Sequence, residues 1–310
     1  MKPTADSDDG YRRPSRLSSR VALFLLKLLA GLPLPVVRLL GKWLGLLLYR
    51  TATRRRRIAS INWAMCFPSQ SAAEQAQGVK QHFIEFAQAW LDRSWLWEGC
   101  EDTVKRRLKL VDQAGIVGQG GAAVLFAPHF VGMDAGWIAL TVHGNRRFCG
   151  IYARQSDPDL DRWMAQGRQR FGNPHIVAKR DGFKPLVSAL RAGEPLYVLP
   201  DMDFGRRDSI FVPFFGQTTA TVPSLPRFAK LGRAQVVPVV SRLTPDGYEV
   251  TLLPPWADYP TDDVTSDTAR MNAELESLVQ VMPTQYYWVH KRFKTRPAGE
   301  PSPYENRRRP

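Results

Sequence analysis

Residues 121–140, GAAVLFAPHFVGMDAGWIAL, decide the fold of this chain. Residues 122–127 form an unbroken apolar run, which is typical of a strand buried on both faces in a parallel sheet. Pro128 and His129 follow this run, and residues 135–140 can continue as a helix. Ligands and reacting groups in open α/β sheets gather at the carboxyl ends of the strands. The stretch therefore predicts an α/β fold with His129 at a functional edge.

His129 and Asp134 lie five residues apart in this stretch and are the candidate catalytic pair. A neutral imidazole takes a proton from a hydroxyl when a carboxylate holds its other nitrogen in the required tautomer. The spacing lets the turn fold Asp134 back onto the imidazole at a helix start, where a negative charge is also favoured. On spacing alone, a histidine that ends a strand and an aspartate that caps the next helix explain the pattern equally well.

Composition restricts the class of protein and its partners. A length of 310 residues allows one large α/β domain or two small ones. The net charge of +14 and the pI near 10.0 indicate an anionic partner, either nucleic acid, an acidic protein or an anionic membrane. The 3 cysteines fit no metal spacing and form no even disulfide set, which favours a reducing compartment and predicts no metal site.

The amino-terminal part of the chain is first basic and then apolar. Residues 1–20 predict a basic disordered arm, and residues 21–57 predict a membrane-associated helical segment. The arginines at 54–57 form a polybasic flank that suits anionic headgroups. The apolar run 21–32 would be about 18 Å long as a helix, too short to cross about 30 Å of hydrocarbon.

The second half of this segment predicts a helix with two different sides. One side carries Arg38, Gly41, Lys42, Gly45 and Tyr49, and the other carries leucines and Trp43. Such a pattern is typical of a helix that lies in a membrane interface. A pair of buried core helices is the alternative, and the sequence leaves open whether the segment spans the membrane or lies in its surface.

The remainder predicts one α/β domain over residues 58–297, with a single mixed, mostly parallel sheet flanked by helices. Ser71 and Glu74 form a capping box that predicts a helix start. Residues 298–310 form a basic, proline-rich tail, and the whole end from residue 288 is expected on the surface. Further strands are expected at 147–153, 175–178, 195–199, 235–243 and 248–253, and further helices at 158–172, 183–191, 223–231 and 266–282.

Two pairs of charged residues are candidates for substrate binding. Arg168 and Arg170 either hold phosphate groups, which match the planar guanidinium, or form a solvated cationic helix end. Asp201 and Asp203 follow the strand expected at 195–199. They either order the site or bind sugar hydroxyls, or they pair with neighbouring arginines in a structural loop.

Four blocks of the sequence, in this order, resemble a known family. They are RRRRIASINWAMCFP at 54–68, APHFVGMD at 127–134, LPDMDFGRRDSIFVPFFG at 199–216 and YYWVHKRFKTRP at 286–297. Together they resemble the late acyltransferases of lipid A biosynthesis, the lauroyl and myristoyl transferases of Gram-negative bacteria. The resemblance covers nearly the whole chain from about residue 20 onward.

The resemblance implies transfer of a fatty acyl group from acyl carrier protein to a hydroxyl of an acyl chain on a phosphorylated lipid A precursor. It implies a glycerolipid-acyltransferase-like fold, a place at the cytoplasmic face of the bacterial inner membrane, and catalytic roles for His129 and Asp134 without a cofactor. The family pattern has Tyr-Arg-Pro where this chain has Tyr152-Ala153-Arg154. Arg154 is therefore the candidate substrate contact at that point.

In this interpretation His129 is the general base, and the acceptor hydroxyl attacks the donor thioester directly, because no cysteine or serine is placed as a nucleophile. Backbone amides near Gly132 and Met133, or a nearby arginine, would stabilise the oxyanion. The anionic membrane is the third expected partner, beside acyl carrier protein and the lipid A precursor.

Three rival functions are considered beside this one. A glycerolipid acyltransferase shares the H-x4-D chemistry, but the loop LPDMDFG at 199–205 differs from its Pro-Glu-Gly-Thr type of loop. A non-catalytic membrane lipid-binding protein is disfavoured by the intact His129 and Asp134. A nucleic-acid-binding protein is supported only by the positive charge, and the sequence carries no recognisable motif for it, so no nucleic-acid partner is predicted.

Overall fold

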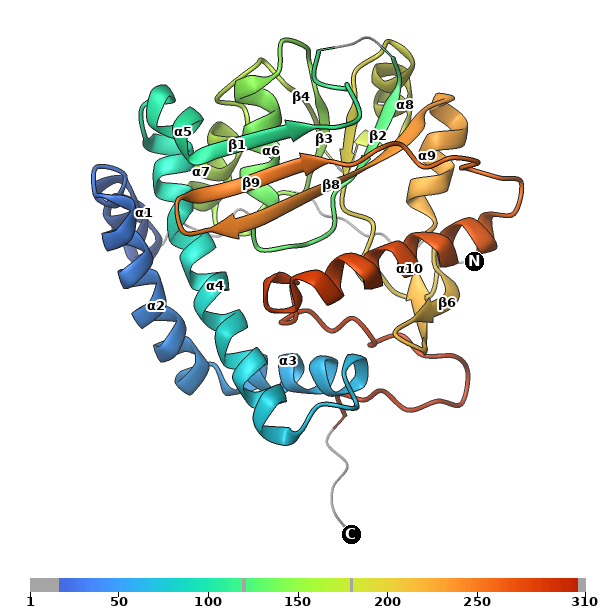
Figure 1. Ribbon diagram of the computed structural model, residues 1–310, viewed down its shortest axis with the longest axis horizontal. Helices are drawn as coiled ribbons and strands as arrows, with labels where there is room; N and C mark the ends of the chain where they lie inside the picture. The colour runs from blue at the N-terminus through green and yellow to red at the C-terminus, as the bar shows by residue number, and fades with distance from the viewer. Residues whose placement is uncertain (1–16, 119–120, 179–180, 306–310) are drawn as a thin grey trace, which may run out of the picture.

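The computed structural model describes residues 17–118, 121–178 and 181–305 and has an α/β architecture (Figure 1). Its main sheet has seven strands in the order β1 (Leu108–Asp112), β9 (Gly247–Leu252), β8 (Gln235–Thr244), β2 (Ala123–Phe126), β5 (Leu196–Val198), β3 (Cys149–Tyr152) and β4 (His175–Ala178). Neighbouring strands from β8 to β4 pair in parallel, whereas β9 is antiparallel to β8 and parallel to β1. The predicted mixed, mostly parallel sheet is therefore confirmed.

Helices surround the sheet, and a separate hairpin joins β6 (Ile210–Phe214) to β7 (Gln217–Thr221). The helices are α1 (Leu17–Leu29), α2 (Leu34–Thr51), α3 (Thr53–Cys66), α4 (Ala72–Glu98), α5 (Glu101–Arg107), α6 (Met133–His143), α7 (Pro158–Arg168), α8 (Lys184–Arg191), α9 (Ser224–Gly232), α10 (Val264–Val281) and the short 3-10 helix η2 (Pro283–Gln285). The capping box of Ser71 and Glu74 begins α4 as predicted. Asp157 caps α7, which ends at Arg168 and not at Gly172 as expected.

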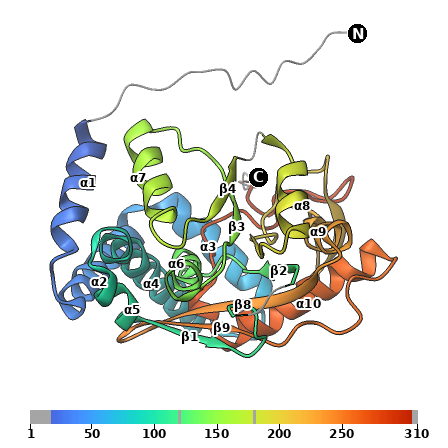
Figure 2. The same ribbon diagram turned by 90° about the horizontal axis from the view of Figure 1, so that it is seen from above.

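The two faces of the sheet belong to two hydrophobic cores, because successive side chains of a strand point to opposite faces. In β2, Ala123 and Leu125 pack with α6, whereas Val124 and Phe126 pack with α8, α9 and α10. Figure 2 shows α2, α4 and α6 at one end of the molecule and α8, α9 and α10 at the other. All four residues of β2 are buried, which explains its unbroken apolar run.

The register of β2 against β5 positions the predicted functional edge. Phe126 and Val198 are partners at the carboxyl ends of these parallel strands. His129 and Asp201 each lie three residues beyond those partners. The parallel pairing therefore brings together two residues that are 72 positions apart in the sequence.

In α2, the residues Arg38, Gly41 and Gly45 of the side that was expected to be polar are buried and face α4. Gly41 and Gly45 let α2 approach α4 closely, since a Cβ at Gly45 would lie 2.5 Å from the Cα of Ile84. The buried guanidinium of Arg38 forms an ion pair with Asp92, with 3.0 Å between Nη2 and Oδ2. Figure 1 shows α1, α2 and α4 side by side along one edge of the molecule.

The opposite sides of α1 and α2 expose large apolar side chains. They are Leu17, Val21, Phe24, Leu25, Leu28, Val36, Leu39, Leu40, Trp43 and Leu47. Within the described residues, no helix has the length and apolar character that crossing a membrane requires. Of the arm expected at 1–20, residues 1–16 lie outside the described part of the chain, and residues 17–20 already belong to α1.

The carboxyl-terminal segment is packed into the protein, so the expectation that it lies on the surface from residue 288 is wrong. Trp288 and Phe293 are buried in the core. The buried Arg292 donates to the carbonyl oxygen of Ala220 and to the hydroxyl of Thr221, both at 2.9 Å. The basic residues of this segment therefore satisfy backbone and side-chain acceptors inside the protein as well as facing water.

Candidate active site

His129 is bonded to Asp201 through two hydrogen bonds. The imidazole Nδ1 lies 2.7 Å from Oδ1 of Asp201, and the backbone N–H of His129 donates to Oδ2 at 3.1 Å. The side chain of Asp201 is fully buried, whereas that of His129 is 19% exposed. An ionised carboxylate can only accept a hydrogen bond, so Nδ1 must be the donor. The ring proton of the neutral imidazole is therefore on Nδ1, and Nε2 carries the lone pair.

Electrostatics around the pair favour an ionised Asp201 and a neutral His290. Burial acts to raise the pKa of Asp201, but the charge and hydrogen bonds of His129 and the charge of Arg292 lower it overall. Burial lowers the pKa of His290 to about 4, and the charges of His129 and Arg292 act in the same direction. His290 accepts the backbone N–H of Asp203 at Nε2, 3.3 Å away, which is a structural contact.

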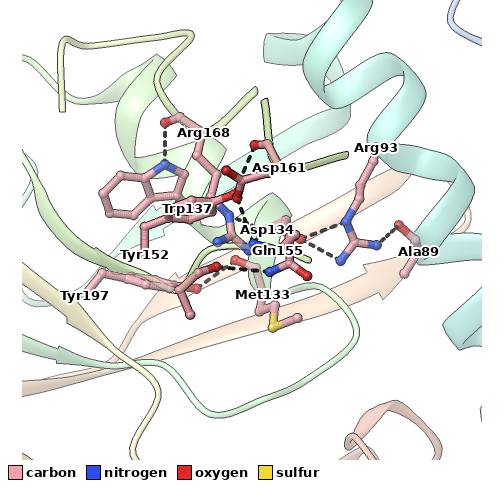
Figure 3. A network of polar contacts seen from close by, with 11 residues as sticks. Ala89, Arg93, Met133, Asp134, Trp137, Tyr152, Gln155, Asp161, Arg168 and Tyr197 are labelled. Carbon is pink, nitrogen blue, oxygen red and sulfur yellow. Dashed lines mark hydrogen bonds and ion pairs between the residues drawn. The ribbon is translucent and has the colours of Figure 1, made fainter. Parts of the chain in front are cut away.

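Asp134 lies in the first turn of α6 and binds two arginines (Figure 3). Arg168 donates to Oδ1 from Nε at 3.0 Å and from Nη2 at 2.8 Å. Arg93 reaches Oδ2 from Nε at 2.8 Å and from Nη2 at 2.6 Å. Burial acts to raise the pKa of the Asp134 carboxyl, but the guanidinium groups of Arg168 and Arg93 lower it to about 2.

The structure therefore does not place Asp134 against the imidazole of His129, as the spacing suggested. Both carboxylate oxygens of Asp134 are occupied by Arg93 and Arg168. Within the described residues, no hydrogen bond or ion pair joins Asp134 to His129. Ordering the site was one role considered for Asp201, but its contact with His129 cannot be inferred from local spacing, because the two residues are 72 positions apart. No motif in the sequence of α4 indicated Arg93.

Arg168 and Arg170, the candidates for phosphate binding, are both engaged by the protein. Arg168 holds Asp134, as described above. Arg170 donates to the carbonyl oxygens of Leu96 and Gly99 at the end of α4. Both guanidinium groups therefore have protein partners, although Nη1 of Arg168 makes no hydrogen bond with the described residues.

Of the other two candidates, Arg154 has no hydrogen-bond partner among the described residues, whereas Asp203 has such a partner. Arg154 is exposed just beyond the carboxyl end of β3 and makes no hydrogen bond or ion pair with any described residue. Asp203 accepts from the backbone N–H and the hydroxyl of Thr295, at 2.6 and 2.8 Å, and thus holds the carboxyl-terminal segment. The structural role considered for Asp203 is supported, with Thr295 in place of the arginines as its partner.

A narrow cavity of about 50 Å³ borders the Asp134–Arg168 pair. Its lining comprises Met133, Asp134, Trp137, Gly150, Ile151, Arg168, Ile176, Tyr197 and Leu199. The hydroxyl of Tyr197 donates to the carbonyl oxygen of Met133 at 2.9 Å. One end of this cavity is charged, and the remainder is apolar.

One group of described residues has the ligand types of a metal site. The potential ligand atoms of Cys149, His175 and Glu194 lie within 4.8 Å of one another. Nδ1 of His175 is 3.0 Å from Oε2 of Glu194, and burial raises the pKa of the Cys149 thiol to about 12. The group lies at the amino ends of β3, β4 and β5, so it is remote from the edge that carries His129 and Asp201.

Comparisons with known proteins agree with the resemblance of the sequence blocks. The family model described as bacterial lipid A biosynthesis acyltransferase matches residues 6–295. The Escherichia coli K12 lipid A biosynthesis lauroyltransferase is 32% identical over 90% of this chain and 92% of its own. The palmitoleoyltransferase of the same strain is 30% identical over 98% of this chain and 100% of its own, and the myristoyltransferase is 32% identical over 88% and 84%.

Among solved structures, the 1-acyl-sn-glycerophosphate acyltransferase of Thermotoga maritima covers 72% of this chain and 94% of its own, at 14% identity and a TM-score of 0.35. That likeness is too low to carry a conclusion. The family match and the three Escherichia coli relatives extend over almost the whole chain. This chain belongs to the bacterial lipid A biosynthesis acyltransferases.

Proposed function

We propose that this enzyme transfers a fatty acyl chain from acyl carrier protein to a hydroxyl of an acyl chain on a phosphorylated lipid A precursor. His129 is the general base of this reaction. The observation that carries the proposal is the bond from Nδ1 of His129 to the buried carboxylate of Asp201, which leaves Nε2 as the basic nitrogen. Membership of the family supplies the class of reaction.

In the transfer step Nε2 of His129 takes the proton of the acceptor hydroxyl, and the hydroxyl oxygen attacks the carbonyl carbon of the thioester. The tetrahedral intermediate then collapses, the carbon–sulfur bond breaks, and the thiolate takes the proton from the imidazolium. Asp201 stabilises that imidazolium through its ionised carboxylate and keeps the ring oriented. The acyl group passes directly from donor to acceptor through this tetrahedral intermediate, with no acyl-enzyme.

Arg168 is the group that we assign to the oxyanion of the intermediate. Nε and Nη2 of this arginine donate to Asp134, and Nη1 makes no hydrogen bond with the described residues. Of the two backbone amides considered, that of Met133 is already bonded to the carbonyl oxygen of Phe130 at 3.0 Å, whereas that of Gly132 donates no hydrogen bond within the described residues and is a second donor for the oxyanion. Asp134 thus acts by fixing Arg168 and Arg93, and Arg154 is left as a free cation for substrate.

The exposed apolar sides of α1 and α2 are the proposed contact with the inner membrane, from its cytoplasmic face. Trp43 and Leu47 are 62% and 56% exposed, respectively, although both are large apolar side chains on one helix. Surfaces of this kind on a soluble protein mark a contact site. Arg50 and Arg54 follow on the same helical segment and suit anionic headgroups, and the net charge of +14 also suits acidic acyl carrier protein.

A radiolabel transfer assay tests the function. Membranes that contain the wild type or His129→Ala receive a tetra-acylated lipid A precursor and a panel of acyl carrier protein thioesters. The wild type should label the precursor and His129→Ala should not, whereas His143→Ala, a histidine at the end of α6 outside the site, should retain transfer. Because the names of the relatives give three different acyl chains, the panel also identifies the preferred chain.

Transfer to lysophosphatidic acid in place of the lipid A precursor would move the enzyme to glycerolipid synthesis. Absence of transfer to either acceptor would leave a non-catalytic membrane lipid-binding protein.

A further inference from the structure

A second hollow of the protein is lined by three cations and no acid. It has a volume of about 230 Å³ and is formed by Arg54, Arg57, Ile58, Lys291 and Tyr304. Arg54 and Arg57 come from α3, and the other two polar residues come from the carboxyl-terminal segment. Figure 1 shows α3 and this segment close together at the lower end of the molecule.

The positive charge in this hollow is not compensated by the described residues. Arg54 makes no hydrogen bond or ion pair with them. Arg57 donates only to the backbone carbonyl oxygens of Tyr304 and Glu305, at 3.0 and 3.2 Å, which orient the guanidinium without neutralising it. The ammonium of Lys291 lies 5.5 Å from the centre of the Tyr304 ring. Three cations around one hollow, two of them oriented by these contacts, form a site for a multiply charged anion.

The hollow is fixed relative to His129. The side-chain amide of Asn62 on α3 donates to the carbonyl oxygens of Trp288 and His290, at 2.7 and 2.6 Å. At the other end of this segment, the backbone N–H of Tyr287 donates to the carbonyl oxygen of His129 at 2.9 Å. Lys291 lies four positions after Tyr287, a span of at most about 14 Å. The hollow and the proposed general base are therefore joined by a short, anchored segment.

We propose that this hollow binds a phosphate group of the acceptor glycolipid while His129 acts on a hydroxyl of the same molecule. The inference rests on the proposed function and adds a location for the phosphorylated end of the acceptor. Arg168 and Arg170 were the candidates from the sequence, and the structure gives both of them protein partners. A phosphate monoester presents several oxygens to Arg54, Arg57 and Lys291 without burying an unpaired charge.

The hollow also lies where a membrane lipid would present its headgroup. Arg54 follows α2 directly, and α2 exposes the apolar side that we assign to the membrane. An anionic phospholipid headgroup has the same chemistry as the phosphate of the acceptor. The short anchored segment between the hollow and His129 favours the acceptor, and the experiment separates the two sources.

The test compares acceptors that carry and lack the phosphate. The double variant Arg54→Gln/Lys291→Gln removes two charges from the hollow. It keeps Arg57, whose guanidinium donates to the backbone carbonyl oxygens of Tyr304 and Glu305. The matched control Lys42→Gln/Arg50→Gln removes two exposed charges from α2, away from the hollow. The measured quantity is the ratio of kcat/KM for the phosphorylated acceptor to that for its dephosphorylated form.

The hollow variant should lower this ratio by about ten- to a hundredfold, mainly through KM, because charge-assisted hydrogen bonds to phosphate are lost. The control should change both acceptors alike and keep the ratio within about twofold. Binding of the two acceptors to the hollow variant in a His129→Ala background should show the same loss of preference without turnover.

An unchanged ratio in the hollow variant, with transfer to both acceptors intact, would overturn the phosphate site and leave the proposed function standing. An equal loss in the control would attribute the effect to general surface charge and would also overturn it. Loss of binding to phosphatidylglycerol vesicles by the hollow variant, with the acceptor preference retained, would assign the hollow to a phospholipid instead. If the wild type acylated neither acceptor, the proposed function would fail, and the binding experiment would still decide the site.

Discussion

Nδ1 of His129 lies 2.7 Å from the carboxylate of Asp201, although the two residues are 72 positions apart in the sequence. Asp134, the acid that follows His129 in the motif, binds Arg93 and Arg168 instead. The two acids therefore have different tasks in this account. Asp201 orients the base, and Asp134 holds the two buried guanidinium groups of Arg93 and Arg168. Substitution of Asp134 should therefore lower the stability of the fold, whereas substitution of Asp201 should lower turnover.

Asp134→Asn should destabilise the fold strongly. The substitution leaves the guanidiniums of Arg93 and Arg168 buried without their counter-charge, which costs about 3–5 kcal/mol in comparable buried pairs. Urea unfolding followed by circular dichroism measures this cost. Glu249→Gln, which removes a carboxylate from an exposed pair with Lys109, is the control and should change the midpoint little. Equal midpoints for the two variants would contradict the structural role of Asp134.

Substitution of Leu39, Trp43 and Leu47 by serine should weaken membrane binding without destabilising the fold. All three side chains are exposed on α2, so their removal creates no cavity. Sedimentation with anionic vesicles measures the binding, and urea unfolding measures the stability. A variant that sediments like the wild type would show that the apolar side of α2 is not the membrane contact.

Gly45→Ala should destabilise the protein although alanine is the better helix former by about 1 kcal/mol. The new Cβ would lie 2.5 Å from the Cα of Ile84 and 2.6 Å from the carbonyl oxygen of Phe83, so α2 would have to move away from α4. We expect a loss of about 1–3 kcal/mol, as for other overpacked sites. Thermal unfolding checks it, and a higher Tm would argue against the close α2–α4 contact.

Stability should fall as the pH drops from about 6.5 to about 4, and His82 should contribute to the loss. Burial lowers the pKa of His82 to about 4, from the ordinary histidine value of about 6.5. In that window the unfolded chain binds a proton at this histidine and the native state does not, so acid favours unfolding. The full contribution is on the order of a few kcal/mol.

His82→Asn tests this contribution, because the asparagine amide can still donate to the carbonyl oxygen of Thr284, as Nδ1 of His82 does at 2.9 Å. The urea midpoint of this variant should fall less between pH 7 and pH 5 than that of the wild type. Parallel shifts in the two proteins would mean that His82 has its ordinary pKa in the native state.

Sequence patterns predicted the interior strands well because those strands are apolar on both faces. β2 and β5, which are buried over their whole length, lie within the stretches where they were expected. β1 and β7 were missed: β1 is an edge strand with mixed burial, and β7, QTTAT, has one apolar residue. In both cases the neighbouring strand, rather than the local sequence, specifies the extended conformation.

The contacts of the site could be predicted only in part. The edge that carries His129 followed from the strand before it, but its partner follows from the register of β2 against β5, which no local pattern encodes. The carboxyl-terminal segment was misjudged for a related reason. Its arginines suggest a surface, whereas Trp288 and Phe293 fill the core and Arg292 finds acceptors on β7. Contacts between residues far apart in the sequence determine both the partner of His129 and the burial of the carboxyl-terminal segment.

The kinetics of Asp201→Asn test the central claim most directly. An asparagine amide at this position would donate to Nδ1 of His129 and place the ring proton on Nε2, the wrong tautomer for a base. We predict a fall in kcat of about 10³- to 10⁴-fold, with KM within a few-fold and an unchanged circular dichroism spectrum. Retention of wild-type turnover by Asp201→Asn, with loss of turnover by a folded Asp134→Asn, would contradict the account and return the orienting role to Asp134.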